Sequence, residues 1–197
     1  MRKSIIKRKT KETNVKVIFN LDGQGKYRIN TTIPFMDHML GLFAFHGNFD
    51  LIINAKGDRD IDDHHLVEDI GIALGEAFSK SLGNNKNIER FGQFLIPMDE
   101  TLSYVAIDIS GRFFLKYDVK FNRSYKWLKS EFNYNLIEDF FLAFVSTAKI
   151  TMHIVNKYGR SNHHIAESIF KGFGKALSQA AAINPKRKTV SSTKGRL

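Results

Sequence analysis

Two stretches of the chain decide its fold: HHLVEDIGIALGEAF (His64–Phe78) and HHIAESIFKGFGKAL (His163–Leu177). They lie 99 residues apart and share six of fifteen positions. The same offset pairs Ala44-Phe45 with Ala143-Phe144, so the similarity extends upstream of the histidines. Separate segments that repeat at one offset are typical of an internal repeat. The sequence therefore predicts a duplicated fold.

The first copy reads as strands, a helix, a strand and a second helix. VKVIFNL (15–21) and KYRINTTI (26–33) flank Asp22-Gly23 and predict a hairpin. MDHMLGLFAFHG (36–47) predicts a helix that stops at a glycine, and LIINAKGD (51–58) predicts a short strand. The second helix follows the capping candidates Asp62 and Asp63, and its apolar residues recur at helical spacing: Leu66, Ile70, Ala73, Leu74 and Ala77.

The second copy repeats this order. SYVAIDIS (103–110) and RFFLKYDVKF (112–121) predict strands around Gly111, and NLIEDFFLAFVSTAKI (135–150) predicts a helix. We therefore expect an α+β fold of two similar half-domains, residues 1–95 and 96–197, each a small sheet backed by two helices. Such halves would bury their sheet faces against a shared helical layer.

The positive charge of the chain is concentrated at its ends. The formal net charge is +10, yet eleven cations stand in the two terminal segments, which leaves 19 cations against 20 anions elsewhere. Solvated termini and an anionic small-molecule ligand both fit this distribution. An RNA-binding module is a rival interpretation, which the near-neutral remainder disfavours.

Composition also limits the compartment and the kind of metal site. The chain has no cysteine, so disulfides are excluded and any metal must be held by histidine and carboxylate. No apolar run approaches the roughly 20 residues of a membrane span, and the first residues lack the apolar region of a secretory signal. We expect a cytoplasmic protein.

The repeated HHxxE pattern predicts two metal ions. On a helix, residues i and i+3 share a face, so His65 with Glu68, and His164 with Glu167, can each bind one cation. Neighbouring histidines point about 100° apart, so His64 and His163 must serve a different ion from the second histidine of their pair. His38 and His153 remain to complete the two sets, while His46 is left unassigned as a ligand.

Three imidazoles and one carboxylate would leave positions open for a substrate. Ligand type does not choose among Mn, Fe, Co, Ni and Zn, and a metal-storage protein would show the same pattern. Asp62 and Asp63 are candidate partners for the second ring nitrogens of the imidazoles. Sequence also leaves open whether the two HHxxE helices meet within one chain or across subunits.

These motifs resemble the imidazoleglycerol-phosphate dehydratase family from Glu12 to the C-terminus. The similar segments are PFMDHMLGLFAFHG, DDHHLVEDIGIALGEA, PMDETLSYVAIDISGR, GRSNHHIAESIFKGFGKAL and the terminal SSTKG. The resemblance implies a hydro-lyase of histidine biosynthesis that converts imidazole glycerol phosphate to imidazole acetol phosphate with two Mn ions. It also implies a homo-oligomer of 24 subunits with sites where subunits meet, and no nucleic-acid or membrane partner.

The resemblance assigns roles residue by residue. One ion takes His38, His65, Glu68 and His163, and the other takes His64, His153, His164 and Glu167. Glu12 is the implied acid/base, and His65, Glu68, His164 and Glu167 are the other implied catalytic residues. The implied substrate contacts are Glu12, His38, His46, Arg90, Arg112, Lys171, Ser192 and Lys194, with the terminal SSTKG closing over the phosphate.

Overall fold

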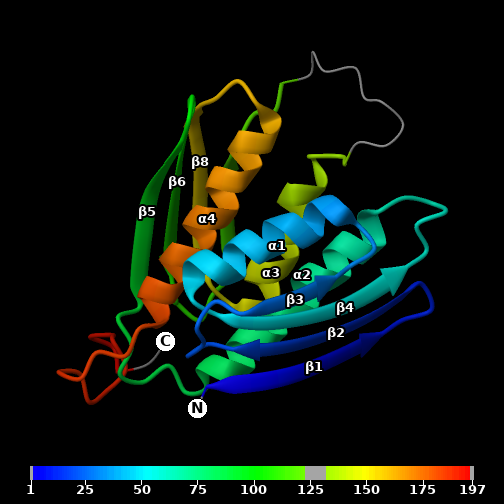
Figure 1. Ribbon diagram of the computed structural model, residues 1–197. Coiled ribbons are helices and arrows are strands. Elements are labelled where there is room, and N and C mark those ends of the chain that lie inside the picture. Colours follow the sequence, from blue (N-terminus) through cyan, green and yellow to red (C-terminus); the bar gives the residue numbers. More distant parts are fainter. Residues whose placement is uncertain (1, 123–131, 196–197) are drawn as a thin grey trace.

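Two four-stranded sheets enclose the helices in the computed structural model of the protein, which describes residues 2–122 and 132–195 (Figure 1). The first half contains β1 (Lys3–Lys9), β2 (Thr13–Asn20), β3 (Tyr27–Asn30), α1 (Pro34–Gly47), β4 (Asp50–Gly57) and α2 (His64–Leu82). The second half contains β5 (Phe91–Met98), β6 (Thr101–Asp108), β7 (Phe114–Asp118), α3 (Leu136–Ala148), β8 (Thr151–Tyr158) and α4 (Asn162–Ala181). Arg196, one of the terminal cations, lies outside the described residues.

The two sheets have the same topology, which confirms the predicted α+β duplication. Their strand orders are β1-β2-β4-β3 and β5-β6-β8-β7. In each sheet the last two strands of the order are parallel and the other pairs are antiparallel. The division expected between residues 95 and 96 falls inside β5, all of which pairs with β6.

The predicted hairpin of β2 with β3 is wrong. Helix α1 carries the chain back from β3, so β4 enters parallel to β3 and lies between β3 and β2. The loop that replaces the hairpin turn is held by Asp50 at the start of β4. Its carboxylate accepts hydrogen bonds from the backbone N–H groups of Gln24 at 2.8 Å and Lys26 at 3.2 Å.

The sequence did not predict two edge strands, β1 and β5. The basic N-terminus forms β1, paired along its length with β2, so it is not a solvated tail. Its cations and the Pro97 of β5 are typical of edge strands, where exposed charge and a missing N–H discourage pairing with other chains. Only one residue of each strand is buried, and neither strand alternates cleanly between apolar and polar residues.

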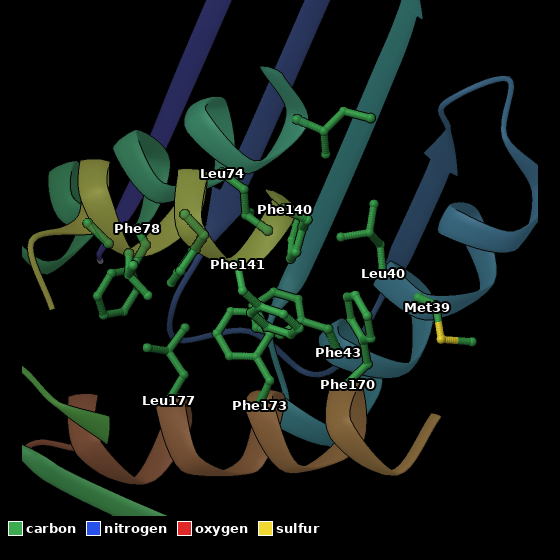
Figure 2. Packing of buried hydrophobic residues seen from close by; sticks show 14 of the residues in the cluster. Met39, Leu40, Phe43, Leu74, Phe78, Phe140, Phe141, Phe170, Phe173 and Leu177 are labelled. Atoms are coloured by element: carbon green, nitrogen blue, oxygen red, sulfur yellow. The ribbon is translucent and has the colours of Figure 1, made fainter. Parts of the chain in front are cut away.

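The four described helices pack between the sheets around a phenylalanine-rich core (Figure 2). Helix α1 packs on α4 and α2 packs on α3. Phe43 and Phe173 stack across the first crossing with ring centroids 4.4 Å apart, and both are fully buried. These crossings fix how the beginnings of α2 and α4, which carry the histidine pairs, lie relative to the rest of the fold. Among the described residues no helix is long and apolar enough to cross a bilayer.

Candidate metal centre

The beginning of α4 presents both histidines of the second pair. The Ser161 hydroxyl accepts the backbone N–H of His164 and caps the helix, which fixes the first turn. Because α1 crosses α4, His38 reaches the same place from 129 residues away: its Nε2 lies 2.7 Å from Glu167 Oε1. His163 Nε2 lies 3.1 Å from the same oxygen. Three candidate metal ligands, His38, His163 and Glu167, therefore converge on one point.

Glu167 is a buried carboxylate surrounded by donors. Its second oxygen accepts a hydrogen bond from Lys171 Nζ at 2.7 Å. Burial acts to raise the pKa of Glu167, but the hydrogen bonds from Lys171, His38 and His163 outweigh burial and hold the pKa at about 2. The group is thus an anion at neutral pH, as a metal ligand must be.

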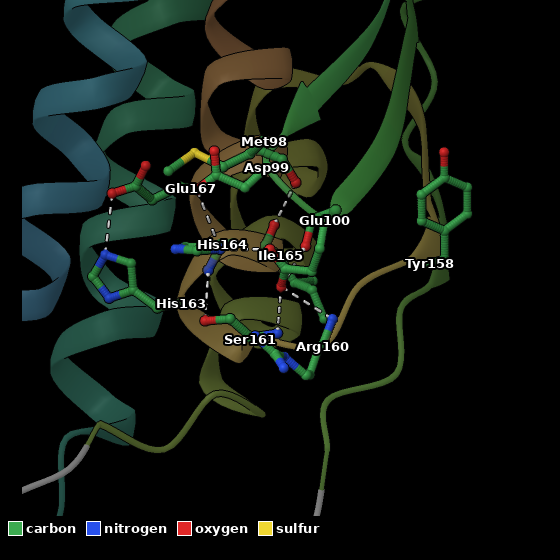
Figure 3. A network of polar contacts seen from close by, with 12 residues as sticks. Met98, Asp99, Glu100, Tyr158, Arg160, Ser161, His163, His164, Ile165 and Glu167 are labelled. Atoms are coloured by element: carbon green, nitrogen blue, oxygen red, sulfur yellow. Dashed lines mark hydrogen bonds and ion pairs between the residues drawn. The ribbon is translucent and has the colours of Figure 1, made fainter.

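His164 points to a different carboxylate (Figure 3). Its Nδ1 lies 2.8 Å from Glu100 Oε2, at the turn between β5 and β6. The other oxygen of Glu100 accepts the backbone N–H groups of Ser161 at 2.7 Å and Arg160 at 3.2 Å. The hydrogen bond from His164 and those from the backbone lower the pKa of Glu100 to about 2.

The beginning of α2 forms a second cluster. His65 Nδ1 lies 3.1 Å from Asp58 Oδ2, and His64 Nδ1 lies 3.5 Å from Asp139 on α3. The hydrogen bond that His65 donates to the Asp58 carboxylate is the main cause of a raised His65 pKa, and the charge of Glu12 adds to it. Glu12 thus lies near His65, beside a hollow of about 430 Å³ that it lines together with Asp58. The Glu68 side chain is exposed.

The sequence predicts Asp62 and Asp63 as caps or as partners of the imidazoles, and among the described residues neither contacts an imidazole ring. Asp62 accepts the backbone N–H of His64 at 2.8 Å, whereas Asp63 stands at the N-cap position of α2 and makes no side-chain cap hydrogen bond. Asp63 pairs with the Arg59 guanidinium at 2.6 Å. The ring nitrogens of His64 and His65 instead face Asp139 of α3 and Asp58 after β4.

His153 lies apart from both clusters. Its neighbours in β8, Met152 and Ile154, are fully buried toward the helices, so His153 is on the outer face of the sheet. There its ring lies 5.7 Å from that of Phe114.

Within one chain, the eight candidate ligands therefore lie at separate places. Within residues 2–122 and 132–195, two groups of three have donor atoms within 4.8 Å of one another: His38 with His163 and Glu167, and Asp99 with Glu100 and His164. The first group unites His38 and His163, which the family resemblance gives to one ion, with Glu167, which it gives to the other. His64, His65, Glu68 and His153 join neither group.

Two substrate-binding candidates lie beside Glu167. Lys171 contacts it directly, and His46 lies in the last turn of α1. Burial lowers the pKa of His46, and the charges of Lys171 and Lys175 lower it further. His46 is therefore a neutral imidazole in a positive environment, which suits a ligand that carries negative charge.

The other phosphate candidates lie at the opposite end of the second sheet. Arg90 precedes β5 with a φ of 76°, binds both carboxylate oxygens of Asp108, and donates to the Ser191 carbonyl at 2.8 Å. Ser192 is partly buried and Lys194 is exposed beyond that contact. Arg112 follows β6 at the same end and is exposed. Since β5 has eight residues, roughly 25 Å separates Arg90 from the turn that holds His164.

Sequence reasoning missed Asp58 and Glu100. A signal for Glu100 was present, because Glu12-Thr13 at the beginning of β2 recurs as Glu100-Thr101 at the beginning of β6. The two dipeptides are 88 residues apart, whereas the histidine pairs are 99 apart. A search at one fixed offset therefore passes over the second carboxylate.

Comparison with known proteins identifies the family. The family model described as imidazoleglycerol-phosphate dehydratase matches residues 31–177. A protein of that name from Endomicrobium trichonymphae is 56% identical over 98% of this chain and 97% of its own length. One from Thermodesulfovibrio yellowstonii is 50% identical over 99% of both chains.

Solved structures of the family have the same fold. The Pyrococcus furiosus structure, in complex with (S)-C348, superposes with a TM-score of 0.82 at 37% identity and covers 98% of this chain and 100% of its own. The Staphylococcus aureus structure gives a TM-score of 0.79 at 38% identity over 92% of this chain and 100% of its own. The chain therefore belongs to the imidazoleglycerol-phosphate dehydratase family of hydro-lyases in histidine biosynthesis.

Proposed function

We propose that the chain converts imidazole glycerol phosphate to imidazole acetol phosphate at a site that holds two divalent metal ions, Mn in the first instance. The observation that carries the metal part is the convergence of His38, His163 and Glu167 within 4.8 Å. Imidazole and carboxylate in this mixture suit Mn and its neighbours in the first transition row. The donor set of the chain therefore fits the group that the family uses.

The ligands of the two ions follow the family pattern. One set is His38, His65, Glu68 and His163, and the other is His64, His153, His164 and Glu167. The ionised state of Glu167 supports its role, and so does the contact of His164 Nδ1 with Glu100, which leaves Nε2 without a hydrogen bond among residues 2–122 and 132–195. When bound, the ions supply Lewis acidity to the ring nitrogens of the substrate.

The remaining residues bind and orient the substrate and move its protons. Glu12 accepts the proton from the second carbon of the glycerol chain, and a proton is returned as the hydroxyl on the carbon bonded to the ring leaves as water. The enol that remains takes a proton on the carbon bonded to the ring and becomes the ketone of the product. The proximity of Glu12 to His65 supports this placement. His46, Lys171, Arg90, Arg112, Ser192 and Lys194 bind the phosphate end, with the terminal SSTKG folded over it.

The active site is formed where subunits meet, in a cytoplasmic homo-oligomer of 24 subunits on the family pattern. Two observations support sites between chains. The α2 histidines join no ligand group of α4 within the described residues. Arg90 and His164 of one chain also lie too far apart to contact the same small substrate.

Replacing Glu68 or Glu167 by glutamine tests this function. Each is the one carboxylate of its ligand set, so we expect weakened metal binding and a fall in turnover of at least about 100-fold. Metal content and turnover of imidazole glycerol phosphate are the measurements, and Glu76→Gln, on the exposed face of α2, is the matched control. Two tightly held ions per chain and normal turnover in both variants would contradict the assignment. Metal binding without turnover in the unmodified protein would instead indicate metal storage.

A further inference from the structure

The two halves of the fold place Glu12 and Glu100 at equivalent positions. Both β2 and β6 have eight residues, begin with a buried threonine, and pair antiparallel with an edge strand on one side and a central strand on the other. Glu12 and Glu100 immediately precede these threonines. By the same symmetry His65 in α2 corresponds to His164 in α4. Each half therefore has a glutamate on the turn before its second strand, and this turn faces the candidate metal-binding histidine of the same half.

The two glutamates nevertheless make different contacts. Glu100 holds His164 Nδ1 with one oxygen and two backbone N–H groups with the other. Glu12 shows no side-chain hydrogen bond or ion pair within residues 2–122 and 132–195. In the first half Asp58, not Glu12, contacts the ring nitrogen of His65.

The residue after the fourth strand of each half explains the difference. In the first half this residue is Asp58, directly after β4, and in the second half it is Gly159, directly after β8. A Cβ atom at Gly159 would lie 2.5 Å from Thr101 Oγ1 and 2.8 Å from Ile165. Glycine thus lets the turn before β6 approach the beginning of α4, and Glu100 takes the place that Asp58 fills in the other half.

We propose that Glu100 is a positioning residue that holds His164 with a proton on Nδ1 and leaves Nε2 free to bind a metal ion. A carboxylate anion only accepts hydrogen bonds, so the proton of the neutral imidazole must be on the nitrogen that faces it. Asp58 does the same for His65. Consequently Glu12 is the one of these two glutamates whose carboxylate makes no side-chain hydrogen bond within residues 2–122 and 132–195, and its exposed side chain can reach a substrate. This inference rests on the proposed function.

Glu100→Gln separates positioning from a purely structural role. The amide oxygen can keep the two backbone N–H bonds, which places the NH₂ group toward His164. That group donates to Nδ1, so the proton moves to Nε2 and the ligand nitrogen is blocked. A structural role predicts unchanged metal binding, because the backbone contacts persist. The positioning role predicts Mn affinity about 10- to 100-fold weaker at one class of site.

The measurement is titration of the metal-free protein with Mn²⁺, followed by the paramagnetic resonance signal of free Mn²⁺. Glu76→Gln is the control and should bind like the unmodified protein. Thermal unfolding in chelator should change little in either variant. Equal Mn affinity in Glu100→Gln and the unmodified protein overturns the positioning role. Failure of the unmodified protein to bind Mn²⁺ or turn over imidazole glycerol phosphate refutes the proposed function instead.

A second pair of variants keeps the test decisive if Glu100→Gln unfolds. Glu100→Asp and Glu100→Asn share a shortened side chain and differ in whether the group facing His164 can donate. The aspartate variant should bind Mn²⁺ more tightly than the asparagine variant. Equal affinities in this pair also overturn the proposal.

Discussion

At the scale of single residues, carboxylates hold the loops of this fold by accepting backbone N–H groups. The hydrogen bond from the N–H of Gln24 lowers the pKa of Asp50, burial opposes it, and a hydrogen bond from Asn20 lowers the pKa further. A carboxyl whose folded pKa is depressed stabilises the fold above its unfolded pKa, and this stabilisation is lost as the pH falls through the folded pKa.

Asp50→Asn should therefore destabilise the protein near neutral pH, by about 1 kcal/mol because the group is partly exposed to solvent. The difference from the unmodified protein should shrink as the pH falls below the usual range of aspartate. Urea unfolding at several pH values measures it, with the exposed Asp118→Asn as control. A difference that stays constant down to acid pH would contradict the role of the Asp50 charge.

Residue types at repeated spacing were predictable from sequence, but their partners were not. The HHxxE copies identified His163 and Glu167, which the structure brings together with His38. The same spacing argument favoured a shared ion for His164 and Glu167, whereas the side chain of Glu167 contacts His163. Asp58 and Glu100 come from loops whose approach to the helices depends on tertiary packing, such as the contact at Gly159, so local sequence carried little signal for them.

At the scale of elements, the helix crossings depend on paired glycines. Gly75 of α2 and Gly174 of α4 occupy the same place in the repeat. A Cβ atom at Gly75 would lie 2.5 Å from the Phe144 carbonyl on α3, and one at Gly174 would lie 2.4 Å from the Phe43 carbonyl on α1. Both contacts are with backbone, which cannot move aside without separating the helices.

We expect Gly75→Ala and Gly174→Ala to destabilise the protein by about 1–3 kcal/mol each, despite the higher helix propensity of alanine. Thermal or denaturant unfolding measures the loss, and Glu76→Ala at an exposed neighbouring position is the control. Unchanged or increased stability in the glycine variants would show that the helices separate without cost.

Helices were predicted more accurately than strand pairing. The apolar spacing located all four described helices because a helix is specified by its own residues. Strand order depends on the path of the chain through α1 and α3, so the sequence around Asp22-Gly23 could suggest a hairpin that β4 prevents. The edge strands β1 and β5 have mostly exposed residues, so they lack the alternation of apolar and polar residues that a half-buried strand shows.

At the scale of the whole molecule, the central claim is that each metal site takes ligands from the first turn of α2 in one chain and from the first turn of α4 in another. Two variants, His65→Ala and His163→Ala, remove proposed ligands of the same ion and should each be inactive alone. When the two variants are produced together, sites between chains can combine the intact His65 of one with the intact His163 of the other.

The most direct test is the turnover of imidazole glycerol phosphate by such mixed assemblies. Random mixing of equal amounts should restore roughly a quarter of the unmodified activity. Each site needs its α2 from the variant that keeps His65 and its α4 from the variant that keeps His163, and each of these conditions is met in about half of the sites. The separately produced variants, combined only after assembly, should stay inactive. If the mixed assemblies are as inactive as either variant alone, each site takes both histidines from a single chain and the central claim is wrong.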